Sequence, residues 1–268
     1  MRNALFALCL AAAILLPVVP SSTASAAPAR TDQLPVKTDT NDHWAGYVAV
    51  SKKPGYFTEV VSLWHVPVGV KGGLLAAQAA DWVGIDGYGN DHIIQVGTEV
   101  TYNHTVGVQY SAWYEMATSA AESRKGLKPI PRKDMDVHPG DLIEGAVQEL
   151  EPNKWVLYIE DMTTKQQWHK EAPFTTPGMT AEAIHENPNT GGIRVLEWEK
   201  TTNVEFISLA LNHEPVNFVP GYFQGVTLYQ VSMVDYGIHL ATPSKLTGAC
   251  FTVADGGTEP AAPSSCPL

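Results

Sequence analysis

Residues 81–97 read DWVGIDGYGNDHIIQVG, and this stretch decides the fold class. Apolar residues alternate with other residues in Trp82–Ile85 and again in Ile93–Val96. Between them, Asp86–Asp91 is rich in glycine, aspartate and asparagine, which favour turns. Short alternating segments that end at such turn signals predict β-strands.

The same pattern continues on both sides of this stretch. Turn signals such as KKPG, KGG, PGD and EPNK separate further alternating segments about every ten residues. Only Leu74–Ala80 and Ser119–Lys125 suggest short helices. Many short strands with Gly/Pro turns predict an all-β sandwich or barrel. The predicted strands are WAGYVAV (44–50), VVSLWHVPV (60–68), VQYSAWYEM (108–116), LIEGAVQEL (142–150), WVLYIEDM (155–162), VEFISLAL (204–211) and GVTLYQVSMV (225–234).

The N-terminus predicts export. Arg2 precedes the apolar run Ala4–Leu16, and the following polar residues end in Ala-Ser-Ala at 24–26, a form that signal peptidase accepts. The run is shorter than the roughly 20 residues of a membrane-spanning helix, which disfavours an anchor. We therefore expect a signal peptide at 1–26 and a secreted, extracellular protein.

The rest of the chain is expected to form one domain. Residues 27–40 are polar and contain proline, which predicts a flexible lead or a short propeptide. Residues 41–252 would form the β-sandwich domain, and the Gly/Pro/Ser-rich residues 253–268 a C-terminal tail.

The charge balance is acidic. Removing residues 1–26 takes away Arg2, leaving 16 basic against 28 acidic residues and a net charge of −12. This charge would repel nucleic acid and anionic membranes, so neither is an expected partner. As pH falls and carboxylates become protonated, the chain loses electrostatic self-repulsion, which suits an acidic medium. We also expect a monomer.

Two cysteines remain after the signal peptide, Cys250 and Cys266. In an oxidising compartment such a pair predicts one disulfide, here tethering the C-terminal tail. Two free thiols are the alternative, and a metal site is disfavoured because no histidine is spaced beside them.

Strand parity places several polar residues on shared faces, because residues two apart in a strand point the same way. If the strands are neighbours, one sheet face carries tryptophans, an amide and carboxylates. Such a face is typical of a groove for an extended polymer, the alternative being a partly buried aromatic patch with solvated acids. The residues predicted to share a face are Trp82 with Gly84 and Asp86, Gln95 with Gly97 and Glu99, Trp113 with Glu115, and Glu182 with Glu186.

Several familiar chemistries lack their motifs. The sequence has no HExxH helix, no GxSxG elbow and no DTG or DSG triplet. Asp86, Asn90 and Asp91 could hold Ca²⁺, but their spacing is not that of an EF-hand and a plain turn is the simpler interpretation. No metal site and no metal or organic cofactor is therefore expected.

The order of the motifs resembles that of the glutamic peptidases (eqolisins) over nearly the whole mature chain. The motifs are HWAGYVAV (43–50), WHVPV (64–68), DWVGIDG with HIIQVG (81–97), YSAWYE (110–115), PGD (139–141) and AEAIHENP (181–188). The resemblance implies a concanavalin-like, jelly-roll sandwich of two antiparallel sheets with a Gln/Glu dyad on a concave face.

Carried over position by position, the dyad would be Gln95 and Glu186. The resemblance also implies that Trp82, Asp86, Glu99, Trp113 and Glu115 hold substrate or orient the dyad. Two positions depart from the family pattern: Ala183 stands where an aromatic or bulky residue is usual, and His185 where an aliphatic one is.

This dyad predicts an acid-active endopeptidase that hydrolyses polypeptides. A Glu with an ordinary pKa of about 4.3 is half ionised in mild acid, so Glu186 can act as base and then as acid. Gln95 cannot titrate, but its amide can orient the water and stabilise the oxyanion. The alternatives are a lectin-like carbohydrate-binding sandwich and a glycoside hydrolase that uses Glu115 and Glu186 as its carboxylate pair.

Overall fold

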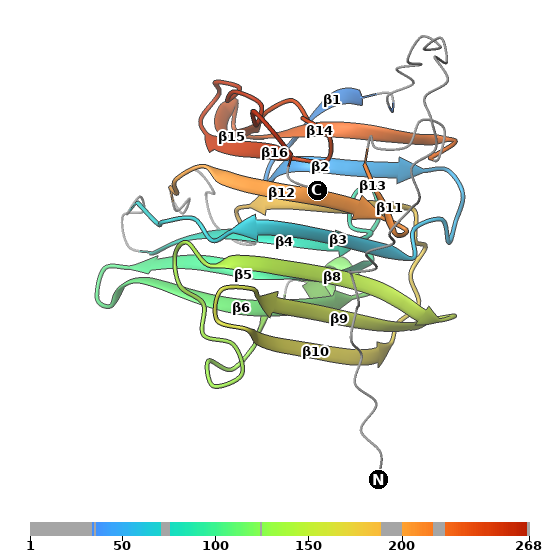
Figure 1. The fold of residues 1–268 in the computed structure, drawn as a ribbon, viewed down its shortest axis with the longest axis horizontal. Helices are drawn as coiled ribbons and strands as arrows, with labels where there is room; N and C mark the ends of the chain where they lie inside the picture. Colours follow the sequence, from blue (N-terminus) through green and yellow to red (C-terminus); the bar gives the residue numbers. More distant parts are fainter. Residues whose placement is uncertain are drawn as a thin grey trace, which may run out of the picture. The chain divides into compact units, whose positions relative to one another are not determined.

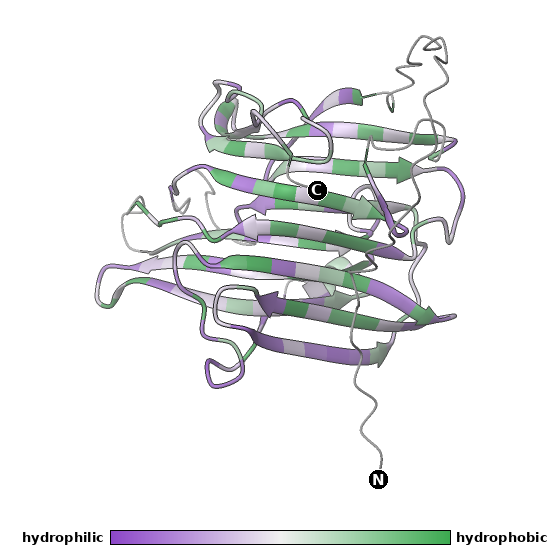
Figure 2. Cartoon of the chain, viewed as in Figure 1, coloured by the Kyte–Doolittle hydropathy of each residue, from purple (hydrophilic) through white to green (hydrophobic). Residues whose placement is uncertain are grey.

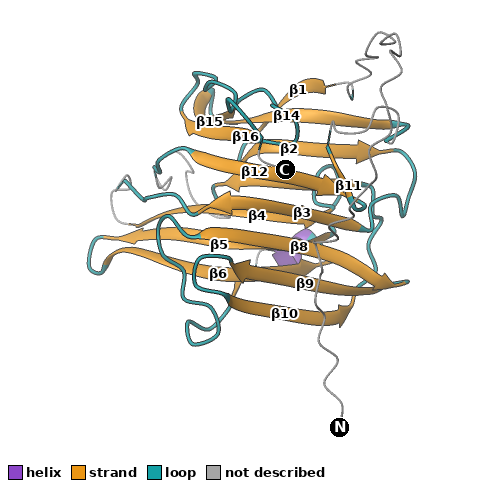
Figure 3. Ribbon diagram, in the orientation of Figure 1, coloured by secondary structure: helices purple, strands orange, loops and turns teal. Residues whose placement is uncertain are grey.

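The computed structural model describes Leu34 and residues 36–70, 76–123, 125–188, 200–216 and 223–266. The predicted signal peptide lies outside these residues. Figure 3 shows that the described chain is almost entirely strands and loops, with one helical turn, α1 (Ala120–Ser123), at the expected Ser119–Lys125. The predicted all-β class is confirmed.

The described part of the chain contains sixteen strands. They are β1 Val36–Asn41, β2 Trp44–Ser51, β3 Glu59–His65, β4 Ala76–Ile85, β5 Ile93–Asn103, β6 Gly107–Ala117, β7 Lys128–Pro129, β8 Leu142–Glu151, β9 Lys154–Asp161, β10 Gln166–Pro173, β11 Thr180–Glu186, β12 Val204–Leu211, β13 Glu214–Pro215, β14 Val226–Asp235, β15 Ile238–Pro243 and β16 Phe251–Asp255.

These strands form a sandwich of two layers. Neighbours are hydrogen-bonded in the order β10-β9-β8-β3-β12-β16-β15-β14-β2-β11-β4-β5-β6-β7. Strands β3, β8 and β9 contact β4 and β5 across the interface, and Figure 1 shows the two groups one in front of the other. The layers are not separate sheets, because β15 and β16 carry the hydrogen bonding from one to the other.

The core between the layers follows from the strand alternation. Trp64 of β3, Phe206 of β12 and Phe251 of β16 are fully buried there, and the rings of the last two stack at 4.6 Å. At the outer edge of its layer, β10 is mostly hydrophilic in Figure 2. On the neighbouring strand β9, buried residues alternate with half-buried ones, which is typical of an antiparallel layer with one face on the core and the other in solvent.

Three expected boundaries differ in the structure. The helix suggested for Leu74–Ala80 is wrong from residue 76 onward, since Ala76–Ala80 begin β4 and pair with β5. Residues 36–40 of the expected flexible lead form β1, which pairs in parallel with β14. Residues 253–255 of the expected tail belong to β16. In each case strand pairing with a distant segment overrides the local composition.

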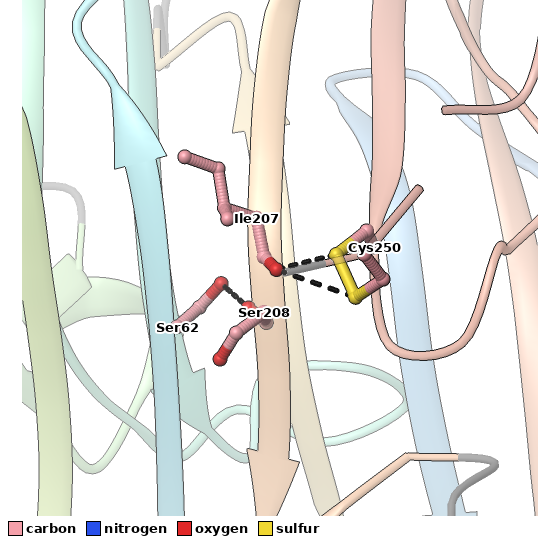
Figure 4. The surroundings of a disulfide bond; sticks show 5 residues. Ser62, Ile207, Ser208 and Cys250 are labelled. Atoms are coloured by element: carbon pink, nitrogen blue, oxygen red, sulfur yellow. Dashed lines mark hydrogen bonds between the residues drawn. A yellow bond between two sulfur atoms is a disulfide. The ribbon is translucent and has the colours of Figure 1, made fainter. Parts of the chain in front are cut away.

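The predicted disulfide between Cys250 and Cys266 is confirmed. Both sulfur atoms lie against the carbonyl oxygen of Ile207, as Figure 4 shows. Ile207 stands where the register between β12 and β3 shifts, next to the bond from the Ser62 hydroxyl to the Ser208 carbonyl. The tail is therefore tied to an irregular point of β12.

Candidate active site

The layer β2-β11-β4-β5-β6 brings the predicted site residues onto one face. Across these strands, Gly84 of β4 lies beside Gln95 of β5, which lies beside Glu115 of β6. One step along, Ile184 of β11 lies beside Trp82. The shared face that parity predicted for β4, β5, β6 and β11 is therefore formed, with β4 separating the strands of Gln95 and Glu186.

Tryptophans form the floor of this face. Trp82 and Trp113 are fully buried and pack with Trp44 and Ile184 in a cluster separate from the interlayer core. The rings of Trp44 and Trp82 meet edge to face at 4.9 Å. Trp82 and Trp113 were expected to hold substrate or orient the dyad, and their burial leaves neither side chain accessible to a substrate.

Two glycines make room for Trp82. A Cβ on Gly97 would lie 2.3 Å from the Asp81 carbonyl oxygen and 2.5 Å from the Trp82 Cβ. A Cβ on Gly84 would lie 2.9 Å from the Trp82 ring and 3.0 Å from the Gln95 Cβ. The glycine of WVG is therefore required by the Trp82 ring, and the glycine of QVG by the close approach of β4 at Asp81 and Trp82.

Glu186 ends β11 between two of these tryptophans. The indole Nε1 of Trp82 donates to Glu186 Oε2 at 2.6 Å, and Trp44 is the cross-strand neighbour of Glu186 on β2. Burial raises the pKa of Glu186 to about 7, with Glu115 adding to the rise and His43 and the two indoles opposing it. Glu186 is therefore a carboxyl group that changes charge near neutral pH.

Gln95 is buried and held by a second carboxyl group. Its Nε2 donates to Glu115 Oε2 at 2.6 Å, and its Oε1 has no hydrogen-bond partner among the described residues. Burial raises the pKa of Glu115, opposed by the bond from Gln95, by Ser123 and by Lys128. This bond decides which way the amide points, leaving one N–H and the oxygen for other partners.

Glu99 and a pocket complete the site. Ser111 Oγ donates to Glu99 Oε1 at 2.8 Å, and burial raises the pKa of Glu99. A pocket of about 340 Å³ opens beside it. The pocket is lined by Gln78, Glu99, Glu115, Ser123, Gly126, Leu127, Glu186 and Pro188.

Asp86 does not contact this pocket, contrary to the expectation that it holds substrate. Its φ of 63° turns the chain after β4, and its carboxylate is fully buried. It accepts hydrogen bonds from the amides of Gly178, Met179 and Thr180 and from the Thr176 hydroxyl. Asp86 is thus a structural residue that fastens residues 176–180 ahead of β11. Parity missed this because β4 ends at Ile85.

The sequence did not single out Trp44 as a residue of the site. Its place before Gly46 and Val48 in HWAGYVAV was the available signal. Glu182 shares the site face as parity predicted, but it is fully buried and burial raises its pKa well above the ordinary value. His185 faces the other side, where it pairs with Asp81.

The Ala183 side chain, where the sequence departs from the family pattern, lies away from the site. Ala183 is fully buried in the interlayer core, beside Val83 of β4 and Tyr47 of β2. It therefore faces away from the site, and its small side chain does not shape the pocket.

Neither a metal site nor a membrane span is found in the described part of the chain. No three His, Cys, Asp or Glu side chains there are grouped as metal ligands. No helix there is long and apolar enough to cross a membrane.

Comparison with known proteins agrees with the motifs. The model of the Peptidase A4 family, the eqolisin or glutamic peptidase family, matches residues 42–232. The chain belongs to this family. It is thereby a hydrolase that acts on peptide bonds, which favours the peptidase over the carbohydrate-binding and glycoside-hydrolase alternatives. A search of the curated proteins gives no match.

Solved structures of the family share the fold. Scytalido-glutamic peptidase with a transition state analog inhibitor aligns with a TM-score of 0.61 at 20% identity, over 80% of this chain and 98% of that one. SCP-B, an eqolisin in complex with the tripeptide Ala-Ile-His, gives 0.58 at 18% over the same shares. Aspergilloglutamic peptidase from Aspergillus niger gives 0.51 at 22%, over 67% of this chain and 99% of that one.

Proposed function

We propose that this peptidase hydrolyses internal peptide bonds of polypeptides in mildly acidic to neutral medium, with Glu186 and Gln95 as its catalytic pair. One observation carries the proposal. A carboxyl group with a pKa near 7 and a non-titrating amide lie on the same face of one layer, each held by its own hydrogen-bond partner.

The reaction follows from these two groups. Ionised Glu186 takes a proton from a water molecule as the water oxygen attacks the scissile carbonyl carbon. The carbonyl oxygen becomes an oxyanion, which the second N–H of Gln95 stabilises while the first stays on Glu115. Protonated Glu186 then gives its proton to the leaving nitrogen as the C–N bond breaks, which returns Glu186 to its ionised state.

The environment of Glu186 suits both steps. Burial raises the pKa of Glu186 to about 7, so its carboxylate is a stronger base than that of an exposed Glu. In mild acid most Glu186 is protonated and a minority is ionised. The Trp82 N–H favours the ionised form, because it donates to the carboxylate.

We also propose that the protein acts outside the cell. The support is the anatomy of residues 1–26, a charged residue followed by an apolar run and Ala-Ser-Ala. The Cys250–Cys266 disulfide agrees, because such bonds persist in oxidising compartments.

Digestion of a denatured protein substrate between about pH 3 and pH 7 tests the mechanism. We expect Glu186→Ala to lose roughly 10²–10⁴-fold in kcat, and Gln95→Ala roughly 10²–10³-fold. Glu160→Ala and Gln167→Ala, on β9 and β10 of the other layer, are matched controls that should cleave like the wild type. Equal cleavage by all five proteins would refute the catalytic pair.

A further inference from the structure

Two adjacent contacts tie β4 to β11, one on each face of the layer. On the site face, Trp82 Nε1 donates to Glu186 Oε2 at 2.6 Å. On the core face, His185 Nδ1 lies 2.7 Å from Asp81 Oδ1. Asp81 and Trp82 are consecutive in β4, as His185 and Glu186 are in β11.

The core-face pair is fully enclosed. The side chains of Asp81 and His185 are each 1% exposed, and the two residues are directly opposed in the strand register. Thr98 of β5 is the neighbour of Asp81 on its other side, and its hydroxyl accepts from Trp64 of β3 across the interface. The pair therefore occupies a place that apolar side chains fill elsewhere in the core.

Three carboxyl groups act on the imidazole. Asp81 of the neighbouring strand β4 is in direct contact with it, Asp255 of β16 acts at longer range, and Glu186 lies on the opposite face of β11. Burial opposes a charged His185, but Asp81 beside it, with Asp255 and Glu186 further off, raises its pKa. An imidazolium between carboxylates is the form that these neighbours favour.

Such a pair is a costly way to fill a core. Removing two charges from water costs several kcal/mol per ion, and apolar replacements of buried pairs are often neutral or stabilising. Buried ion pairs are better suited to fixing strand register. A slip of one residue would move the side chains of the strand to the opposite face and so separate the paired charges.

We propose that Asp81 and His185 are a positioning pair, which holds β11 against β4 so that the Trp82 indole stays on the Glu186 carboxylate. This inference rests on the proposed catalytic role of Glu186. It assigns a role to His185, the residue that departs from the family pattern just before the catalytic carboxyl.

The first test replaces the whole pair, with Asp81→Val and His185→Ile in one protein. Two β-branched residues suit a buried strand and leave no unpaired charge, so the variant should fold with a melting temperature near that of the wild type. We expect kcat to fall about tenfold with KM nearly unchanged. The acid limb of kcat/KM should move up by about one pH unit, because a weakened donor stabilises the ionised carboxylate less.

The second test asks whether the pair acts through Trp82. In a Trp82→Phe background the indole donor is absent, so the paired replacement should cause little further change in kcat or in the acid limb. Tyr47→Phe is the control. Tyr47 lies on β2, next to β11 and on the same core face, and the replacement removes its buried hydrogen bond to the Ser244 carbonyl. It should keep the wild-type pH profile, and its effect on kcat should stay the same with Phe at position 82.

The outcomes separate this inference from the proposed function. If Glu186→Gln keeps full activity, the catalytic assignment itself fails. If Glu186→Gln is inactive but the paired replacement keeps the wild-type kcat and pH profile, the positioning role is overturned. An undiminished effect in the Trp82→Phe background would also overturn it, because the pair would then act by its charge or by general destabilisation.

Discussion

Strands β9 and β11 each pair antiparallel with both of their neighbours, yet their side chains lie in different surroundings. Along Lys154–Asp161 of β9, buried residues alternate with half-buried ones. Along Thr180–Glu186 of β11, every residue except the last is buried, because the cluster of Trp44, Trp82 and Ile184 covers the second face. β9 is thus an ordinary half-solvated strand, whereas β11 has a second, smaller core over its outer face.

The difference is clearest in one carboxyl group from each strand. Glu160 of β9 lies on the solvent side, bonded to the Tyr158 hydroxyl with Lys165 nearby. Glu186 of β11 lies among indoles, where burial raises its pKa to about 7. Cover on both faces of β11 thus goes with a carboxyl group whose pKa is raised.

The largest expected effect is in the pH profile of activity. If burial governs Glu186, the acid limb of kcat/KM lies near pH 7 instead of near the ordinary value of about 4.3. The ionised fraction, and with it kcat/KM, should rise about fiftyfold between pH 5 and pH 7. Initial rates on a peptide substrate measure this. A limb near pH 4 would show that burial does not raise the pKa of Glu186.

The next effect is in stability as a function of pH. The folded-state pKa of Glu186 is raised, so ionising it disfavours the fold progressively as pH rises from 4.5 to about 7. Glu186→Gln removes this penalty. At pH 8 its free energy of unfolding should be about 1–3 kcal/mol higher than that of the wild type. Below pH 4 the two free energies should be equal.

Denaturant unfolding curves at pH 3.5 and pH 8 measure that difference in the free energy of unfolding. Glu160→Gln is the matched control on β9, with an expected change within about 0.5 kcal/mol at both pH values. A Glu186→Gln variant that gains no stability at high pH would contradict the buried-carboxyl account.

The smallest effect compares two glycines that each lie close to a tryptophan, one in each layer. A Cβ on Gly97 would strike the Asp81 backbone and Trp82, and a Cβ on Gly145 would come within 2.6 Å of the Trp64 ring. Gly97→Ala and Gly145→Ala should each cost about 1–3 kcal/mol of stability. Only Gly97→Ala should lower kcat, since it alone displaces the indole bonded to Glu186. Equal kcat values for both would remove Trp82 from the mechanism.

Much of the site could be predicted from local patterns. Residues two apart share a face whatever the tertiary structure, so parity placed Trp82, Gln95 and Glu186 on shared faces of their strands. By the same rule His185, one residue before Glu186, lies on the opposite face. The rule failed at Asp86, where the backbone leaves the strand with a positive φ and parity no longer applies.

The strand period follows from the order of residues alone, and with it the class of fold and the grouping of residues by face. The motifs of the family are likewise local. Tertiary structure alone decided the partners across strands. The bond from Trp82 to Glu186 and the pair of Asp81 with His185 each join residues 104 positions apart. Local preference reaches only a few residues along the chain, whereas register and burial depend on which distant strands meet. The raised pKa of Glu186 is therefore a property of the assembled sandwich.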